Sequence, residues 1–556
     1  MNEKESPIQS ISVGLGTSGA AAPAGSSTEG QPWVILVCSD LGCTTGGAER
    51  ISAATLNEFL STNSVVISGP VTTGLPDDIE PFHIEYRVTD IKDFSPAVLA
   101  EKLPLLGQLR SAAVHLDAIS RKKVAAADGF AQLTAMNLPQ SIIRQLGTLR
   151  PKLAGGTVPA GGGTATVPSK VDSILSMIDV GDPDASEENT PPAAVQPKDF
   201  VAALTESAEE PFSSAALLKC RESIDRLITT LGETVSAQPF FKAAAGSWQA
   251  LKSLLKIAGR NRDVNIFMHA ASFDAAQRHF SDALSSCAAQ CGVPDLVVWD
   301  YPVTIDTASM QQLEHVGAQA DRYKTLAVVS LDHRDDLYRK IVDREPLKPV
   351  IEQPAYIPLR RLQEADAARC IALCAPDASI PRGLSGKETA ITGGWILAMQ
   401  WLSSVIELSS PFHLQNSSQQ VLDTFAFPKL DSEVVFDANR SGITVLRPGT
   451  TTSPRVLFGD AETPYGSLLF NVLVNRTARL AAEWVGAQDR SVAAENAAPV
   501  LEEFLRTELE PYHILSSSGA VSVAVTEQQS LQVTIDSSVT VAGFPVQFQF
   551  AFRYRE

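Results

Sequence analysis

Residues that could carry chemistry are present in this chain, but few of them have the spacing that chemistry requires. Residues 383–388 (GLSGKE) imitate a phosphate-binding loop, yet the glycines stand too close together and glutamate follows the lysine where serine or threonine is needed. Cys287/Cys291 and Cys370/Cys374 could each place two thiols on one face, but structural zinc usually binds cysteine pairs in closer turns flanked by glycine. The eight histidines are scattered, without a His-Glu-x-x-His motif. We therefore predict no catalytic residue, no metal ligand and no cofactor.

One thiol keeps an enzymatic interpretation open. Cys38 follows an expected buried strand at 34–37, and a cysteine at a strand end could be the nucleophile of a cytosolic α/β hydrolase or reductase. No basic neighbour is indicated that would lower its pKa, which favours a packed core thiol instead. The seven cysteines cannot all pair and no C-x-x-C occurs, so we expect free thiols in a reducing cytoplasm.

Composition and charge limit the possible partners. The 556 residues, 44% of them hydrophobic and 19% charged, can bury about two or three domain cores. A net charge of −18 argues against binding nucleic acid or an anionic membrane, because both need clustered cations. The first ten residues lack the apolar core of a signal peptide, and the most apolar helix candidate, 394–408, is interrupted by Gln400, Ser403 and Glu407. We expect a cytoplasmic protein without membrane insertion.

The clearest secondary-structure signals lie in residues 81–119. Alternating apolar and polar residues predict a half-buried strand over 83–88. Ser95 followed by Pro96 is typical of a helix start, because the hydroxyl can accept an orphan amide and proline lacks an N–H that the first turn leaves unpaired. Pro104 predicts a kink or a fresh helix start. The apolar side of this segment comprises Leu99, Leu103, Leu106, Leu109 and Leu116.

Buried apolar runs alternate with helical patterns through the middle of the chain, which predicts a mainly parallel α/β core. The expected strands of this core lie at 34–37, 264–269, 295–300, 326–331 and 369–374. The C-terminal region differs, with helices expected at 467–485 and 499–509 before strands at 521–525, 531–535 and 546–554. The last strand alternates aromatic with polar residues most clearly. The predicted fold class is therefore α/β, with a mixed α+β end.

Two short amphipathic segments stand apart from these domains. Ile11, Val13 and Leu15 form a weak strand joined to the rest by a small-residue arm at 16–30, and a frayed tail is the alternative interpretation. Residues 170–179 place apolar side chains at helical spacing between the linkers 151–169 and 181–198. Such a short helix is marginal alone, so it docks either onto its own domain or into the groove of a partner. Its apolar residues are Val171, Ile174, Leu175 and Ile178.

The two halves of the chain resemble the two sheath subunits of the bacterial type VI secretion system. The Asp93-to-Pro96 turn followed by Leu-Pro-x-Leu-x-x-Leu-Arg at 103–110, together with the early strand and turn at 31–42, resembles the small subunit. The aromatic pair and W-x-x-L-x-x-L run at 240–254, and the strand-Asp-Tyr step at 295–301, are similar to the large subunit. The likeness runs in the family's order from about residue 8 onward. Here the parts are joined through 151–213, whereas the family keeps them as separate chains, and the second half is shorter.

This resemblance implies a protomer that polymerises helically around an inner tube on a baseplate, with the sheath of a phage-tail-like contractile particle as the alternative. It implies a contractile-sheath fold with strand exchange between protomers and a AAA+ unfoldase as a further partner. The implied domains are 1–30 (exchanged strand and arm), 31–150 (small-subunit-like), 151–213 (linker with the short helix), 214–460 (large-subunit-like) and 461–556 (tube-facing and strand-exchange region). The implied strand-exchange residues are Ile11, Val13, Leu15, Val546, Phe548, Phe550 and Phe552. The implied tube contacts are Glu502, Glu503, Arg506 and Glu508, and the implied unfoldase contacts are Val171, Ile174, Leu175 and Ile178.

Overall fold

The computed structural model describes most of the chain as two compact units. The described residues are 11–14, 32–76, 79–121, 123–124, 126–136, 138–146, 214–259, 261, 263–408, 425–448, 456–458, 462–463, 466–488, 492–526, 530–541 and 544–554. The smaller unit takes its residues from 74–81 and 100–234, and the larger unit takes the remainder. Both units take residues from both sides of the linker at 151–213.

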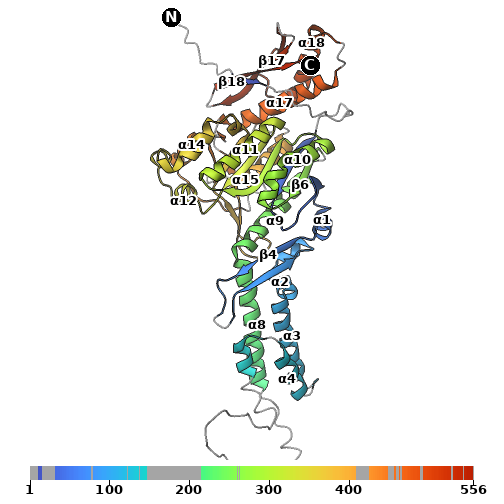
Figure 1. The fold of residues 1–556 in the computed structure, drawn as a ribbon, viewed down its shortest axis with the longest axis vertical. Helices are drawn as coiled ribbons and strands as arrows, with labels where there is room; N and C mark the ends of the chain where they lie inside the picture. The colour runs from blue at the N-terminus through green and yellow to red at the C-terminus, as the bar shows by residue number, and fades with distance from the viewer. Residues whose placement is uncertain are drawn as a thin grey trace, which may run out of the picture. The chain divides into compact units, whose positions relative to one another are not determined.

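An eight-stranded sheet forms the centre of the larger unit (Figure 1), in the order β13-β12-β9-β8-β7-β2-β6-β3. Its parallel strands are β2 (Trp33–Ser39), β6 (Val264–Ala270), β7 (Leu296–Val303), β8 (Leu326–Leu331), β9 (Ile371–Ala375) and β12 (Ile443–Pro448). The edge strands β3 (Glu49–Ile51) and β13 (Val456–Phe458) are antiparallel to their neighbours. Every residue of β2, β6, β8 and β9 is buried, as expected for a parallel sheet covered on both faces. The predicted parallel core is confirmed.

Helices cover the two faces of this sheet. One face carries α9 (Pro239–Ala258) and α15 (Gly393–Leu408), which pack on each other. The other face carries α10 (Phe273–Cys291), α11 (Thr307–Tyr323) and α14 (Ile357–Glu364), whose apolar side chains share one core with alternate residues of β2. Trp33 begins β2 and points to the first face, where its ring meets Trp401 of α15 edge-on at 5.5 Å between centroids. The remaining elements here are α1 (Leu56–Thr62), α12 (Asp336–Val342), α13 (Lys348–Ile351), α16 (Ser432–Arg440), β10 (Ala378–Ile380), β11 (Thr389–Ile391), β14 (Glu462–Thr463), β15 (Gly466–Ser467), η2 (Pro354–Tyr356) and η3 (Asp366–Cys370).

The turn expected near residue 95 is held by Asp93. The predicted strand is present as β5 (Phe82–Arg87), paired antiparallel with β4 (Val66–Val71), and the short helix η1 (Ile91–Phe94) follows it. The Asp93 carboxylate accepts hydrogen bonds from the backbone N–H groups of Thr89 at 2.7 Å and Asp90 at 3.1 Å. The Tyr86 hydroxyl donates to the backbone carbonyl of Asp93 at 2.7 Å. Helix α2 (Pro96–Lys102) then begins at the predicted proline. A separate helix, α3 (Pro104–Ser120), starts at Pro104 as predicted.

The described part of the smaller unit is mainly helical. It contains α3, α4 (Ala126–Ala135) and most of α8 (Ser214–Ala237). Leu106, Leu109 and Leu116 of α3 are buried, in agreement with the predicted apolar side. Asp117 of α3 forms an ion pair with Arg221 of α8, which joins segments on either side of the linker within this unit.

The C-terminal region folds as a second sheet with two helices. Helix α17 (Leu468–Ala487) is followed by α18 (Ala494–Leu509), η6 (Glu510–Tyr512), β16 (Val521–Val525), β17 (Ser530–Val541) and β18 (Phe544–Arg553). The sheet has the order β1-β18-β17-β16, where β1 is Ile11–Gly14. Helix α18 begins before Pro499, earlier than predicted, because Ala494, Ala497 and Ala498 are buried and their packing extends the helix. No helix among the described residues is long and apolar enough to cross a membrane.

Candidate assembly site

The N-terminal strand β1 lies beside the last strand of the chain. β1 pairs in parallel with β18, with Ile11 opposite Phe548 and Val13 opposite Phe550. On its other side β18 pairs antiparallel with β17. The contact between β1 and β18 is four residue pairs long, and β1 forms one edge of the sheet while β16 forms the other. Residues predicted to exchange strands are thus neighbours within one chain, whereas exchange between chains stays a prediction.

The side chains of β18 alternate between two environments. Phe548, Phe550 and Phe552 are buried on one face, and their rings stack with centroids 6.4 and 6.2 Å apart. On the other face Gln547 donates to Asp536 at 2.6 Å, and Gln549 accepts from Gln532 at 3.1 Å. One apolar and one polar face are typical of an antiparallel sheet packed on a helix. Val546 also lies in β18, while Leu15 lies outside the described residues.

Helix α17 packs against this sheet. Phe470 of α17 meets Phe548 edge-on, with ring centroids 5.7 Å apart. Helix α17 also buries polar side chains, among them Asn475, Arg476 and Thr477. The Asn475 side chain donates to the carbonyl of Thr325, just before β8, at 3.2 Å.

A buried carboxylate joins α17 to the amino ends of the central strands. Asp295, just before β7, accepts from Arg476 at 2.8 Å and also from Arg479. Its second oxygen accepts the backbone N–H of Val34 in β2 at 3.0 Å. The side chains of Asp295 and Arg476 are only 1% and 3% exposed. We call Asp295, Arg476 and Arg479 the charged clamp.

Neighbouring groups surround the charged clamp. Arg479 also donates to the carbonyls of Pro294 at 3.1 Å and Lys324 at 2.6 Å. The guanidinium of Arg476 lies over the Trp33 ring at 3.7 Å, a cation–π contact that desolvation strengthens. Because these bonds reach the ends of β2, β7 and β8, the C-terminal sheet is fixed to the core through α17. Sequence analysis did not identify the charged clamp, although polar residues inside an otherwise apolar helix were a visible signal.

The charges predicted to face an inner tube gather on α18. Arg506 pairs with Glu502 at 2.9 Å and with Glu503 at 2.6 Å. Leu501, Leu505 and Leu509 are buried on the opposite side, so the helix is amphipathic. Glu508 lies on the same helix, which leaves a net charge of −2 on this set of three glutamates and one arginine. The unfoldase residues Val171, Ile174, Leu175 and Ile178 lie outside the described residues.

The residues considered for enzyme chemistry have structural roles. Cys38 is fully buried and burial raises its pKa, so its thiol is not the accessible thiolate that a nucleophile requires. In residues 383–388 the Gly383 N–H donates to the Lys387 carbonyl at 2.9 Å, and Gly386 has a φ of +72°. This loop is therefore the turn between β10 and β11. Among the described residues, no three His, Cys, Asp or Glu side chains gather in a way that could hold a metal ion.

A cleft of about 1600 Å³ opens at the carboxyl ends of the parallel strands. Asp300 at its wall accepts from Ser39 at 2.6 Å and Ser247 at 2.5 Å, and burial raises its pKa. Asp377 lines the same cleft, and burial raises the pKa of this carboxyl to about 7. Carboxyl-edge crevices bind ligands in many α/β folds. Cys38 is not among the residues that line this cleft, so the cleft does not support the nucleophile hypothesis.

Comparisons with known proteins give likenesses among solved structures alone. The sequence matches no family model and no curated protein. Among solved structures it is similar to the sheath complex of an extracellular contractile injection system, PVC, determined by cryo-EM in the contracted state. The TM-score is 0.33 and the identity 11%, over 55% of this chain and 77% of that chain. A likeness at this level assigns no role to individual residues.

Proposed function

We propose that this chain is the protomer of a contractile sheath that polymerises helically around an inner tube in a type VI secretion-like machine. The ordered resemblance of its two halves to the small and large sheath subunits supports the proposal. The observation that carries it is the pairing of β1 with β18. A strand at the start of the chain completes a sheet made otherwise from its end, which is the arrangement a strand exchange between protomers requires.

The length of chain before β2 permits such an exchange. Residues 15–32 separate β1 from β2, and a segment of that length spans at most about 60 Å when extended. Because β1 contributes backbone hydrogen bonds, the β1 of a neighbour could make the same bonds to β18. Each bond is worth about 0.5–1.5 kcal/mol net, so each junction contributes a few kcal/mol and repeats along the polymer.

Contraction then moves protomers from one packing to a more stable one while the strand junctions persist. The charged clamp fixes each C-terminal sheet to its core, so a displacement of the core is transmitted to the sheet and through β1 to the next protomer. This mechanism uses stored packing energy and needs no active site. Glu502, Glu503, Arg506 and Glu508 are the proposed inner-tube contacts, and a baseplate would start assembly.

Residues 171–178 are the proposed unfoldase contact. Replacing Leu175 and Ile178 with Asp should leave assembly intact and abolish pull-down of a AAA+ unfoldase. Unchanged binding would end this part of the proposal.

Electron microscopy of the purified full-length protein tests the proposal directly. Tubes with a cogwheel cross-section are expected at high concentration or beside an inner tube. Their attachment to a cell envelope or to a free particle separates the type VI-like machine from a phage-tail-like one. A protein that stays monomeric at high concentration would contradict both.

A further inference from the structure

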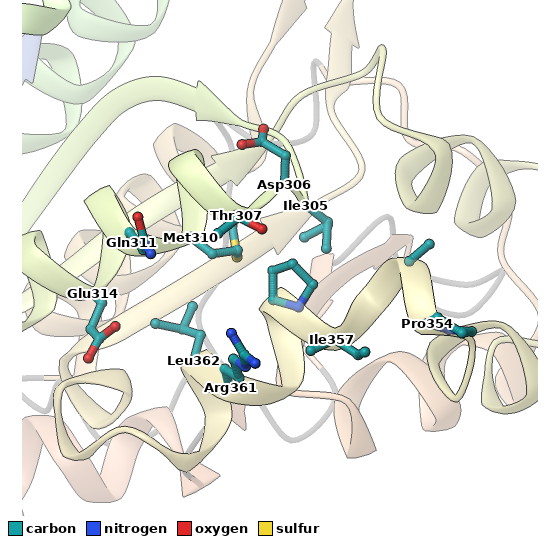
Figure 2. A pocket seen from close by; sticks show the side chains of 12 residues that line it. Ile305, Asp306, Thr307, Met310, Gln311, Glu314, Pro354, Ile357, Arg361 and Leu362 are labelled. Atoms are coloured by element: carbon teal, nitrogen blue, oxygen red, sulfur yellow. The ribbon is translucent and has the colours of Figure 1, made fainter.

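A pocket of about 690 Å³ lies between α11 and α14 on the larger unit. Figure 2 shows Arg361, Leu362 and Ile357 of α14 facing Met310 and Glu314 of α11 across it. Its floor is apolar, because Met310 and Leu362 are buried, while Ile357 at its side is 39% exposed. Glu314 and Arg361 are exposed on its rim. The pocket is therefore a groove with an apolar floor, lined also by the acidic side chains of Asp306 and Glu314 and by the basic side chain of Arg361.

Helix α16 exposes a stripe with the matching composition. Val434, Val435 and Ala438 hold it to the core, whereas the ring of Phe436 is 59% exposed. Glu433, Phe436 and Arg440 follow one another at spacings of three and four, which puts them on one side of the helix. The guanidinium of Arg440 lies 5.7 Å from the centre of the Phe436 ring. We call Glu433, Phe436 and Arg440 the α16 stripe.

The charges of both surfaces are available for an intermolecular contact. Among the described residues neither Glu433 nor Arg440 on the stripe forms an ion pair, and the same holds for Glu314 and Arg361 at the groove. An amphipathic helix that binds in a groove contacts it through side chains spaced three and four residues apart. An exposed aromatic side chain on one surface can bind a complementary pocket elsewhere on the next copy, which joins copies head to tail.

We infer that the α11–α14 groove receives the α16 stripe of a second copy of this chain. Phe436 enters the apolar floor, Arg440 pairs with Glu314, and Glu433 pairs with Arg361. This contact rests on the proposed polymer and adds to it a second junction, made by side chains, besides the strand junction. It gives the polymer a side-chain interface that selects its register, because complementary charges favour one alignment over others.

Substitutions on the two surfaces test the contact in the full-length chain. Phe436→Glu should raise the protein concentration needed for assembly by about tenfold or more, since one buried aromatic side chain is lost from every junction. Arg440→Glu and Glu314→Arg should each do the same, and the double variant should restore assembly. Val114→Glu is the control, because Val114 is 63% exposed on α3 in the smaller unit and should leave assembly unchanged.

A cross-link separates this contact from the sheath proposal itself. Benzoylphenylalanine at position 436, activated by light in a concentrated mixture of isotope-labelled and unlabelled protein, should link to residues 305–314 or 354–362 of another copy. This measurement works whether or not tubes form. Cross-links elsewhere, or Phe436→Glu protein that assembles like the unchanged chain, would overturn the contact while leaving the sheath proposal standing. Correct cross-links without tubes would support the contact and contradict the sheath.

Discussion

At the scale of single residues, Asp295 shows how a buried charge can hold two parts of a fold together. Removing one partner of a buried ion pair is costly because the remaining charges stay desolvated. Here one carboxylate faces two guanidinium groups and also accepts a backbone N–H at the start of β2. An apolar residue at this position would leave all three donors without this acceptor.

Asp295→Ala should therefore destabilise the protein by about 3–5 kcal/mol. Urea unfolding followed by tryptophan fluorescence measures this loss. Glu101→Ala is the matched control, because its ion pair with Arg110 is 58% and 52% exposed and should matter by less than about 1 kcal/mol. A similar small loss for Asp295→Ala would show that the charged clamp is not important for stability.

Asp377 predicts a pH dependence. Burial raises the pKa of this carboxyl from its ordinary 3.8 to about 7, although bonds from the Gly393 N–H and the Tyr338 hydroxyl favour the charged form. A raised pKa means that the folded protein prefers the protonated acid. The contribution of protonated Asp377 to the free energy of unfolding is therefore complete below pH 3.8. It is lost as the pH rises to about 7.

Asp377→Asn should remove this loss, because the amide stays neutral. Between pH 5 and pH 7, below the pKa of about 7, the thermal midpoint of the variant should rise relative to that of the unchanged protein. Above pH 7 the difference between the two midpoints should stay level. A difference that stays level across the whole range would contradict the prediction.

At the scale of elements, β1 is the element whose removal the fold should tolerate. It is an edge strand of four residues, whereas β17 and β18 pair along most of their length without it. Loss of an edge strand removes a few hydrogen bonds and leaves the core intact. The same loss would remove every strand junction between protomers in a strand-exchanged polymer.

Ile11→Pro with Val13→Pro should give a folded, soluble protein that forms no tubes, because proline lacks the N–H that the ladder uses. Deleting residues 1–16 should act in the same way. Circular dichroism and electron microscopy report the two properties separately. Ser12→Ala keeps every backbone donor and serves as the control. Normal tubes from the proline variant would show that β1 is only a tail.

Helix α18 should control which tube the sheath accepts. Its glutamates would meet basic groups and act more on register and steering than on affinity. Glu502→Lys with Glu503→Lys should yield sheaths without a tube when both proteins are co-expressed, as seen by electron microscopy. Asp282→Lys on α10, at a side chain that is 80% exposed, should leave the sheaths filled. Filled sheaths from the α18 variant would refute the contact.

At the scale of the whole molecule, one sheet contains strands from both sides of the linker. β2 lies between β6 and β7, paired with them along seven and five residues, and all its side chains are buried. A strand in that position cannot leave without exposing both faces of the core. The parts of the chain before and after the linker are therefore one folding unit in the larger unit.

Cutting the chain at a protease site inserted near residue 160 should leave the two fragments together in native gel filtration and separate them in urea. The same site inserted near residue 24 is the matched comparison, because it frees β1, which is held by four residue pairs. That peptide should dissociate from the cut protein. Separation of the fragments after the first cut, without denaturant, would mean that β2 does not hold the parts together.

The sequence by itself determined the local elements. Alternation placed β5 and β18, prolines placed the starts of α2 and α3, and uniformly apolar runs predicted a buried parallel sheet. These signals are local, because periodicity and caps depend on residues a few positions apart.

Only the tertiary structure decided the partners. It placed β2 between β6 and β7, set β1 against β18, and enclosed Asp295 with Arg476 and Arg479. Residues about 180 positions apart meet in that clamp, as in the 181-residue separation of Asp295 and Arg476. Neither the hydrophobic period nor the helix caps of one segment identify its distant partner. Strand order and buried charge pairs depend on how whole elements pack.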